Sequence, residues 1–193
     1  GGWIIKTGDA SSVGGNVTIA ADTDGTNGGF IYLLQGLTVN TFGGNFTMGG
    51  GDTSASGYAI GTTYSSGYSG NGIRLDSTVS INTAGNSSDT GGDITIRGKG
   101  YASTWGQFNL NGILKNAGST DINSGTGKII LSGIAPTQQT NATSVGIYYS
   151  GGTNHYFTSA SSTSDAITIT GDASSSASSG AEGILITGAS GKH

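Results

Sequence analysis

The sequence predicts an all-β fold: a right-handed, three-sided parallel β-helix (β-solenoid) of about five coils, with long loops on one edge. Three observations lead to this prediction. Glycine, serine, threonine and asparagine supply 104 of the 193 residues, and these residue types are poor helix formers. Short runs that alternate apolar and polar residues recur along the whole chain, and such alternation is typical of strands with one buried face. Glycine recurs at the entry to these runs.

The repeated cycle contains three runs, which we call strands C, A and B in the order in which they occur. Strand C falls at residues 5–7, 39–41, 81–83, 122–124 and 157–159. Strand A falls at 17–19, 46–48, 94–96, 129–131 and 167–169, and strand B at 31–33, 73–75, 113–114, 147–149 and 184–186. Because the order holds throughout, residues 1–193 are predicted to form a single β-helix segment of a longer repeat protein.

Each cycle is longer than three strands require, and the excess lies between strands A and B. The inserted segments are 20–29, 49–71, 97–111, 132–145 and 170–182, all rich in glycine, serine and threonine. We therefore expect five loops along one edge of the rod, where repeat proteins commonly carry their variable and binding surfaces.

The apolar positions of the three strands predict the core, because in a β-helix the inward side chains of one coil pack on those of the next. The predicted core residues are Val17, Ile19, Ile31, Leu33, Val39, Phe46, Met48, Ile73, Leu75, Val79, Ile81, Ile94, Ile96, Ile113, Ile122, Ile129, Leu131, Ile147, Ile167, Ile169, Ile184 and Ile186.

Two recurring glycine positions predict the corners of the coil. One lies two residues before strand A (Gly15, Gly44, Gly92 and Gly127), and the other directly before strand B (Gly72, Gly112, Gly146 and Gly183). Glycine is expected there because the chain turns with φ values that a Cβ disfavours, or because it packs closely on the neighbouring coil.

Composition excludes several kinds of partner and site. The net charge is −4 and the seven Lys and Arg residues are scattered singly, so no nucleic-acid partner is expected. The longest apolar stretch is a handful of residues, so no membrane insertion is expected. Cysteine is absent, which excludes disulfides and thiolate metal sites. We predict no cofactor.

The aromatic residues of two neighbouring insertions are the candidate ligand-binding site. They are Tyr58, Tyr64, Tyr68, Tyr101 and Trp105. If the insertions stack, these rings meet on one edge, and exposed rings beside polar residues suit sugar faces or a protein partner. The alternative is that the rings cap the side of a thin β-helix.

No catalytic or metal site is predicted. Asp22 and Asp24 are close in sequence, as are Asp89 and Asp93, but neither pair has a partner at the matching place in the next coil. Residues 22–27 resemble the start of a calcium loop, yet Leu33 stands where the bidentate acid is required.

Outward positions of strand A form two columns. Threonine fills one of them except at Ile130 (Thr18, Thr47, Thr95 and Thr168). An ice-binding grid is one reading of this column, and ordinary outward threonine stacking is the other. In the second column, Asp93 and Lys128 are expected to form a cross-strand charge pair.

The strand A repeats resemble a known family. The segments GGNFTMGG (43–50), GGDITIRG (91–98) and GTGKIILSG (125–133), with NGI at 71–73 and 111–113, are similar to the shaft repeats of filamentous-haemagglutinin-like adhesins. The resemblance implies a right-handed β-helix at the bacterial cell surface, exported by two-partner (type V) secretion. The family's secretion domain carries an Asn-Pro motif, and the single proline here, Pro136, follows alanine instead.

Together these observations predict a non-enzymatic, structural or adhesive shaft segment of a large secreted bacterial surface or fibre-forming protein. Its expected partners are neighbouring coils of the same protein or end-to-end copies, and a glycan or host-surface receptor. The alternative is a polysaccharide-binding or polysaccharide-cleaving β-helix that uses the aromatic edge.

Overall fold

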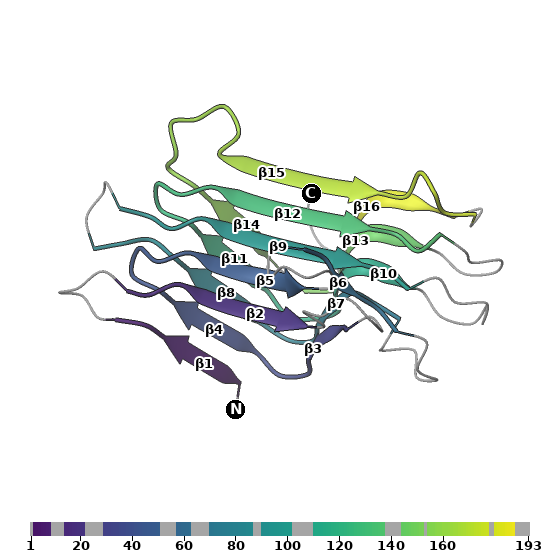
Figure 1. Cartoon of the computed structure of the whole chain (residues 1–193), viewed down its shortest axis with the longest axis horizontal. Coiled ribbons are helices and arrows are strands. Elements are labelled where there is room, and N and C mark those ends of the chain that lie inside the picture. The colour runs from purple at the N-terminus through teal and green to yellow at the C-terminus, as the bar shows by residue number, and fades with distance from the viewer. Residues whose placement is uncertain are drawn as a thin grey trace.

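The computed structural model describes residues 2–8, 14–21, 29–50, 57–62, 70–86, 90–101, 110–137, 144–152, 154–177 and 180–187. These residues form strands and no helix, so none of them lies in a helix that could span a membrane. Three parallel sheets make the three sides of a β-solenoid. The five repeated cycles stack as five layers of strands, and the chain makes about four turns between the first layer and the last. The N-terminal coil (purple) and the C-terminal coil (yellow) lie at opposite ends of the stack (Figure 1). The predicted all-β, three-sided parallel β-helix is confirmed.

Each side contains one strand from each of the five cycles. The C side contains β1 (Trp3–Lys6), β4 (Leu37–Asn40), β8 (Val79–Asn82), β11 (Thr120–Asn123) and β14 (His155–Thr158). The A side contains β2 (Val17–Ala21), β5 (Phe46–Gly50), β9 (Ile94–Lys99), β12 (Ile129–Ile134) and β15 (Ile167–Asp172), with the short β6 (Ala59–Ile60) also paired to β9. The B side contains β3 (Ile31–Leu33), β7 (Ile73–Leu75), β10 (Asn111–Lys115), β13 (Val145–Ser150) and β16 (Glu182–Thr187).

The register places the predicted inward residues in continuous columns. On the A side, for example, Val17 pairs with Phe46, Phe46 with Ile94, and so on to Ile129 and Ile167. Sixteen of the predicted core residues are buried in one cluster, and Ile19 and Leu33 of the first coil are partly buried against it. A period of two along each strand therefore identified the inward face correctly.

The prediction is wrong for the last coil. Ile167, Ile169, Ile184 and Ile186 occupy inward columns, yet they are 41%, 37%, 43% and 65% exposed. The reason is that β15 and β16 pair on one side only, with β12 and β13, so no further coil covers them in the described part of the chain. The core also contains buried apolar residues that the repeat did not identify, which are Leu37, Ala59, Leu110, Leu114, Ala135, Val145 and Tyr149.

The corner glycines are required for close packing. None of the eight has a left-handed φ. A Cβ on Gly92 would lie 2.1 Å from the carbonyl oxygen of Gly44, and a Cβ on Gly112 would lie 2.4 Å from the backbone nitrogen of Ile134. Gly15, in the first coil, has nothing within 4 Å of its Cβ position. Close approach between coils, the second of the two expected reasons, therefore explains these glycines.

Strand A is longer than predicted and ends in a third recurring glycine. β9, β12 and β15 each run for six residues, into the segments expected to be loops. Their glycines lie directly against the glycines that begin strand B: Cβ atoms on Gly133 and Gly171 would lie 2.1 and 1.9 Å from the carbonyl oxygens of Gly146 and Gly183. The ends of these insertions therefore meet along one edge. About half of the inserted residues lie outside the described part.

A column of hydroxyl groups fixes the corner between strands C and A. The side chains of Thr7, Thr41, Thr83 and Ser124 donate hydrogen bonds to the carbonyl oxygens of Gly15, Gly44, Gly92 and Gly127 respectively. Thr41, Thr83 and Ser124 are fully buried. Each hydroxyl thus satisfies a backbone acceptor at the turn, which a buried carbonyl requires.

A second column, of side-chain oxygens just before strand A, adds hydrogen bonds between successive coils to those of the backbone. The backbone N–H groups of Asn45, Asp93 and Lys128 donate to side-chain oxygens of Asn16, Asn45 and Asp93 in the preceding coil, at 2.8–2.9 Å. The expected charge pair between Asp93 and Lys128 is therefore wrong. The ammonium of Lys128 pairs instead with Asp165 Oδ2 at 2.7 Å, because the Asp93 carboxylate is oriented toward the backbone.

Candidate functional site

The predicted aromatic edge is only partly within the described residues. Tyr64, Tyr68 and Trp105 lie outside them, while Tyr58 and Tyr101 are both half-buried. The Tyr58 hydroxyl is hydrogen-bonded to Ser132 Oγ at 2.8 Å. Tyr101 is fixed through its backbone N–H, which donates to the Gly70 carbonyl oxygen at 2.9 Å.

Tyr58 lies across the outer face of the A side. It directly precedes β6, which pairs with Gly98 and Lys99 of β9. Its partner Ser132 lies on β12, the strand beyond β9. The Tyr58 side chain therefore crosses β9 to reach β12, and its hydroxyl is occupied by the protein itself. This geometry is that of a ring that covers the side of the β-helix.

The acidic candidates do not form a site. Asp22, Asp24 and Asp89 lie outside the described residues, and Asp93 accepts the backbone N–H of Lys128. Within the described ranges, no three His, Asp or Glu side chains are grouped closely enough to hold a metal ion.

The described residues instead contain an interior polar cluster, which we define as Lys115, Thr120, Tyr149 and His155. Two inward columns meet at the corner between sides B and C. One column is Leu33, Leu75, Lys115, Tyr149 and Ile186, and the other is Trp3, Leu37, Val79, Thr120 and His155. The first column is apolar in its first two coils and carries Lys115 and Tyr149 in the next two. The second column is apolar in its first three coils and carries Thr120 and His155 in the last two.

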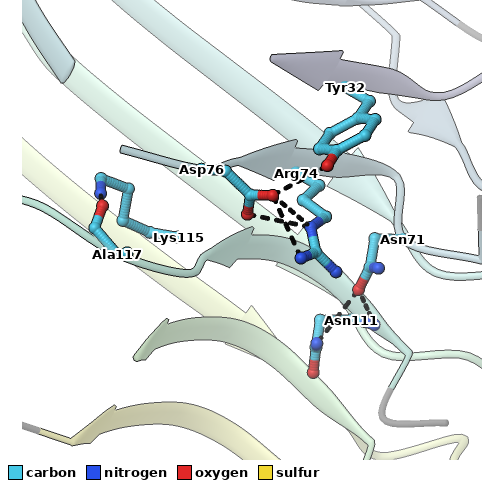
Figure 2. A network of polar contacts seen from close by, with 7 residues as sticks. All are labelled: Tyr32, Asn71, Arg74, Asp76, Asn111, Lys115 and Ala117. Atoms are coloured by element: carbon cyan, nitrogen blue, oxygen red, sulfur yellow. Dashed lines mark hydrogen bonds and ion pairs between the residues drawn. The ribbon is translucent and has the colours of Figure 1, made fainter. Parts of the chain in front are cut away.

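Lys115 is the most unusual member of the cluster. Its side chain is fully buried. Its Nζ donates a hydrogen bond to the carbonyl oxygen of Ala117 (Figure 2) and another, at 3.1 Å, to the carbonyl oxygen of Gly118. Burial lowers the pKa of Lys115 to about 8, and the negative charge of Asp76 opposes this shift. Removing an ammonium group from water is unfavourable unless it is paired. We therefore expect Lys115 to lower the stability of the coil that contains it, with its two hydrogen bonds offsetting part of this cost.

Tyr149 and His155 stack beside Lys115. Their rings meet edge to face at 4.9 Å, and Tyr149 meets Phe157 in the same way at 5.9 Å. Burial raises the pKa of Tyr149, so its phenol is uncharged at neutral pH. Burial and, second, the charge of Lys115 lower the pKa of His155.

The side-chain polar atoms of Thr120 and His155 are buried. Within the described residues, neither the ring nitrogens of His155 nor the Thr120 Oγ1 have a hydrogen-bond partner. An interaction with the Gly151 backbone opposes this lowering of the pKa of His155. Lys115, Thr120 and Tyr149 lie between coils above and below, whereas His155 lies in β14, at the end of the C side. We expect the cluster to affect stability and its pH dependence.

A second network lies on the outer face of the B side. Arg74 Nε and Nη2 donate to the two oxygens of Asp76 at 2.9 and 3.1 Å, and the Tyr32 hydroxyl donates to Asp76 Oδ2 at 2.9 Å (Figure 2). The guanidinium lies 5.4 Å from the centre of the Tyr32 ring. Near the start of the B-side strands, the buried Asn71, which precedes β7, accepts at its Oδ1 two hydrogen bonds from the buried Asn111 of β10. These contacts join neighbouring coils.

Comparison with known proteins gives no relative. The chain matches no family model, no curated protein and no solved structure.

Proposed function

We propose that this chain is a non-enzymatic shaft segment of a large secreted bacterial surface or fibre-forming protein. In this proposal it acts as a stiff spacer that carries binding regions away from the cell or builds a fibre. The strand A repeats, which resemble those of filamentous-haemagglutinin-like adhesins, support the surface location and the export route.

One observation carries the proposal: neighbouring coils are bonded on all three sides at once. Each strand pairs in parallel and in register with the strand of the next coil from the first cycle to the last. The Asn16–Asn45–Asp93 column adds side-chain hydrogen bonds in the same direction. Bending or stretching such a rod requires several hydrogen bonds of one coil to break together, which favours a mechanical role.

Single-molecule stretching between the two termini tests this function. We expect extension in discrete steps, each releasing one cycle of about 38 residues, or roughly 130 Å of chain at ~3.5 Å per residue. A smooth extension without steps, as for a flexible linker, would contradict the proposal.

The alternative, a polysaccharide-binding or polysaccharide-cleaving β-helix, requires rings that are available to a sugar. The Tyr58 hydroxyl is already bonded to Ser132, so the described residues favour the structural role. A glycan array tests the alternative with Tyr101→Ala as the variant. Specific binding that this substitution removes would favour the polysaccharide function over the shaft.

A further inference from the structure

The large apolar side chains that are exposed in the described part of the chain are confined to the two end coils. They are Trp3, Ile4 and Leu34 in the first coil, and Tyr156, Ile167, Ile169, Ile184 and Ile186 in the last. The three coils between them expose none of this kind among their described residues. The exposed large apolar side chains are therefore confined to the first and last coils, which lie at the two ends of the stack (Figure 1).

The outer face of the C side shows that the two ends match each other. One outward column contains Ile4, Thr38, Ser80, Asp121 and Tyr156 in successive coils. Its three middle members are polar, as expected for a surface that faces water. Its two end members are apolar and largely exposed, Ile4 at 80% and Tyr156 at 57%. In a continued stack these two side chains would be direct neighbours.

The inward columns match in the same way. If a second copy continued the stack beyond the last coil in the same register, its Trp3 would lie on His155 and its Ile5 on Phe157, on the C side. On the A side this register places Val17 on Ile167 and Ile19 on Ile169, and on the B side Ile31 on Ile184 and Leu33 on Ile186, although Val17 and Ile31 are already buried within their own copy. Each of these pairs joins apolar or aromatic side chains, like the pairs between coils inside the molecule.

The strands at both ends also present unpaired backbone edges. In the part of the chain that the structure describes, β1, β2 and β3 pair with a neighbouring strand on one side only, and so do β14, β15 and β16. Proteins commonly protect such edges with charges or proline. In these six strands the charged residues are limited to Lys6, Asp172 and Glu182, and proline is absent.

From these observations we propose that the partner of the C-terminal coil is a second copy of this chain, stacked head to tail. β14, β15 and β16 of one copy pair in parallel with β1, β2 and β3 of the next, in the register of the coils within each copy. A second copy is the favoured occupant because both complementary faces belong to this chain. Such a contact does not close on itself, so it produces filaments. In a longer protein, further coils of the same chain would occupy these two faces, so the proposal is for a chain of these 193 residues.

Cysteine cross-linking tests the register, because the natural chain has no cysteine. Thr18 and Thr168 lie in one outward column, so the proposal places Thr18 of one copy beside Thr168 of the next, about 4.8 Å away. The Thr18→Cys/Thr168→Cys variant should form oligomers on oxidation, resolved on non-reducing gels. Thr47→Cys/Thr95→Cys, a neighbouring pair within one copy, is the positive control.

Three controls make the result decisive. Thr18→Cys/Thr170→Cys shifts the pair by two residues and should cross-link at least about tenfold more slowly, because the sulfurs lie beyond disulfide reach. The single variants should form no dimer. The proposal is overturned if the matched pair cross-links no faster than the shifted pair while the positive control closes, or if Thr168→Cys alone dimerises, which indicates tail-to-tail contact.

A charge variant tests the same contact without cysteine. Tyr156→Lys places an ammonium group against Ile4 of the next copy and should weaken self-association at least about tenfold in sedimentation velocity. Ser80→Lys makes the same change in a middle coil of the same outward column and should leave association unchanged. Both positions face outward, and circular dichroism verifies that both variants fold. Equal association of Tyr156→Lys and the natural chain would overturn the proposal.

Discussion

Replacing Lys115 with leucine should make the protein more stable. The side chain is fully buried in a column between Leu75 and Tyr149, where leucine fits the volume and the apolar surroundings. The substitution removes the hydrogen bonds to the carbonyl oxygens of Ala117 and Gly118. Ala117 is exposed, so water replaces the ammonium as the donor to its carbonyl at small cost.

The magnitude follows from the pKa. Lowering the pKa of Lys115 from 10.5 to about 8 means that keeping the ammonium charged in the folded state costs about 3 kcal/mol at neutral pH. Part of this gain is offset by the lost charge-assisted hydrogen bonds. We expect Lys115→Leu to stabilise the protein by about 2 kcal/mol, or to raise Tm by roughly 4–8 °C.

The pH dependence identifies the cause. A base with a lowered pKa destabilises the folded state in full below its folded pKa, and the penalty disappears as pH rises toward the unfolded value. The penalty from Lys115 therefore falls from about 3 kcal/mol at pH 7 to about 1 kcal/mol near pH 10, from the pKa values above. The stability difference between Lys115→Leu and the natural chain should shrink accordingly.

Guanidinium unfolding followed by circular dichroism at the two pH values measures this difference. Lys128→Leu is the matched control, because its ammonium pairs with Asp165 at the surface, where such pairs contribute ~0–1 kcal/mol. The reasoning is refuted if Lys115→Leu lowers stability at pH 7, or if its advantage is the same at both pH values.

Three further predictions concern the corners and the interior cluster. Gly92→Ala should destabilise by about 1–3 kcal/mol, because its Cβ meets a carbonyl oxygen at 2.1 Å, whereas Gly15→Ala, with free space, should change stability by less than about 0.5 kcal/mol in the same unfolding assay. Thr83→Val should cost about 1–3 kcal/mol by removing the buried 2.5 Å hydrogen bond to the Gly92 carbonyl, and the exposed Thr38→Val should cost much less. The lowered pKa of His155 makes its protonation destabilising as pH falls below 6.5, so melting curves of His155→Phe should show a smaller loss of Tm on acidification than those of the natural chain.

The fold could be predicted because two simple patterns repeat five times. Alternation at 94–96 or 129–131 identifies an inward face, and recurrence of the order C-A-B identifies the coil. The same reasoning failed for Ile184 and Ile186, because alternation reports which way a side chain points but not whether a coil covers it. It also missed the corner hydroxyls, although threonine or serine ends strand C in every cycle. That signal is as regular as the glycines and has an equally direct physical cause.

The interior polar cluster could not be predicted in the same way. The alternation that places Ile113 inward also places Lys115 inward. Lysine is almost never fully buried, however, so its residue type argued against the inward position that the alternation indicates. Tyr149 follows another tyrosine, and the side chains of Tyr148 and Tyr149 face opposite sides of the strand: Tyr149 faces the core and Tyr148 faces outward. The burial of both residues depends on the coils above and below, which one cycle of sequence does not contain.

The interior cluster and the proposed head-to-tail contact meet at the same place. His155 lies in β14, an end strand, and the continued register places Trp3 of a second copy directly on it. Covering the imidazole removes it further from water, next to the charge of Lys115 and the uncharged phenol of Tyr149. Protonated His155 is then more unfavourable in the stacked form than in the free end. Self-association measured by sedimentation should therefore weaken as pH falls below 6.5, and His155→Phe should remove most of that dependence. Equal pH dependence in both proteins would show that the imidazole does not lie at the junction.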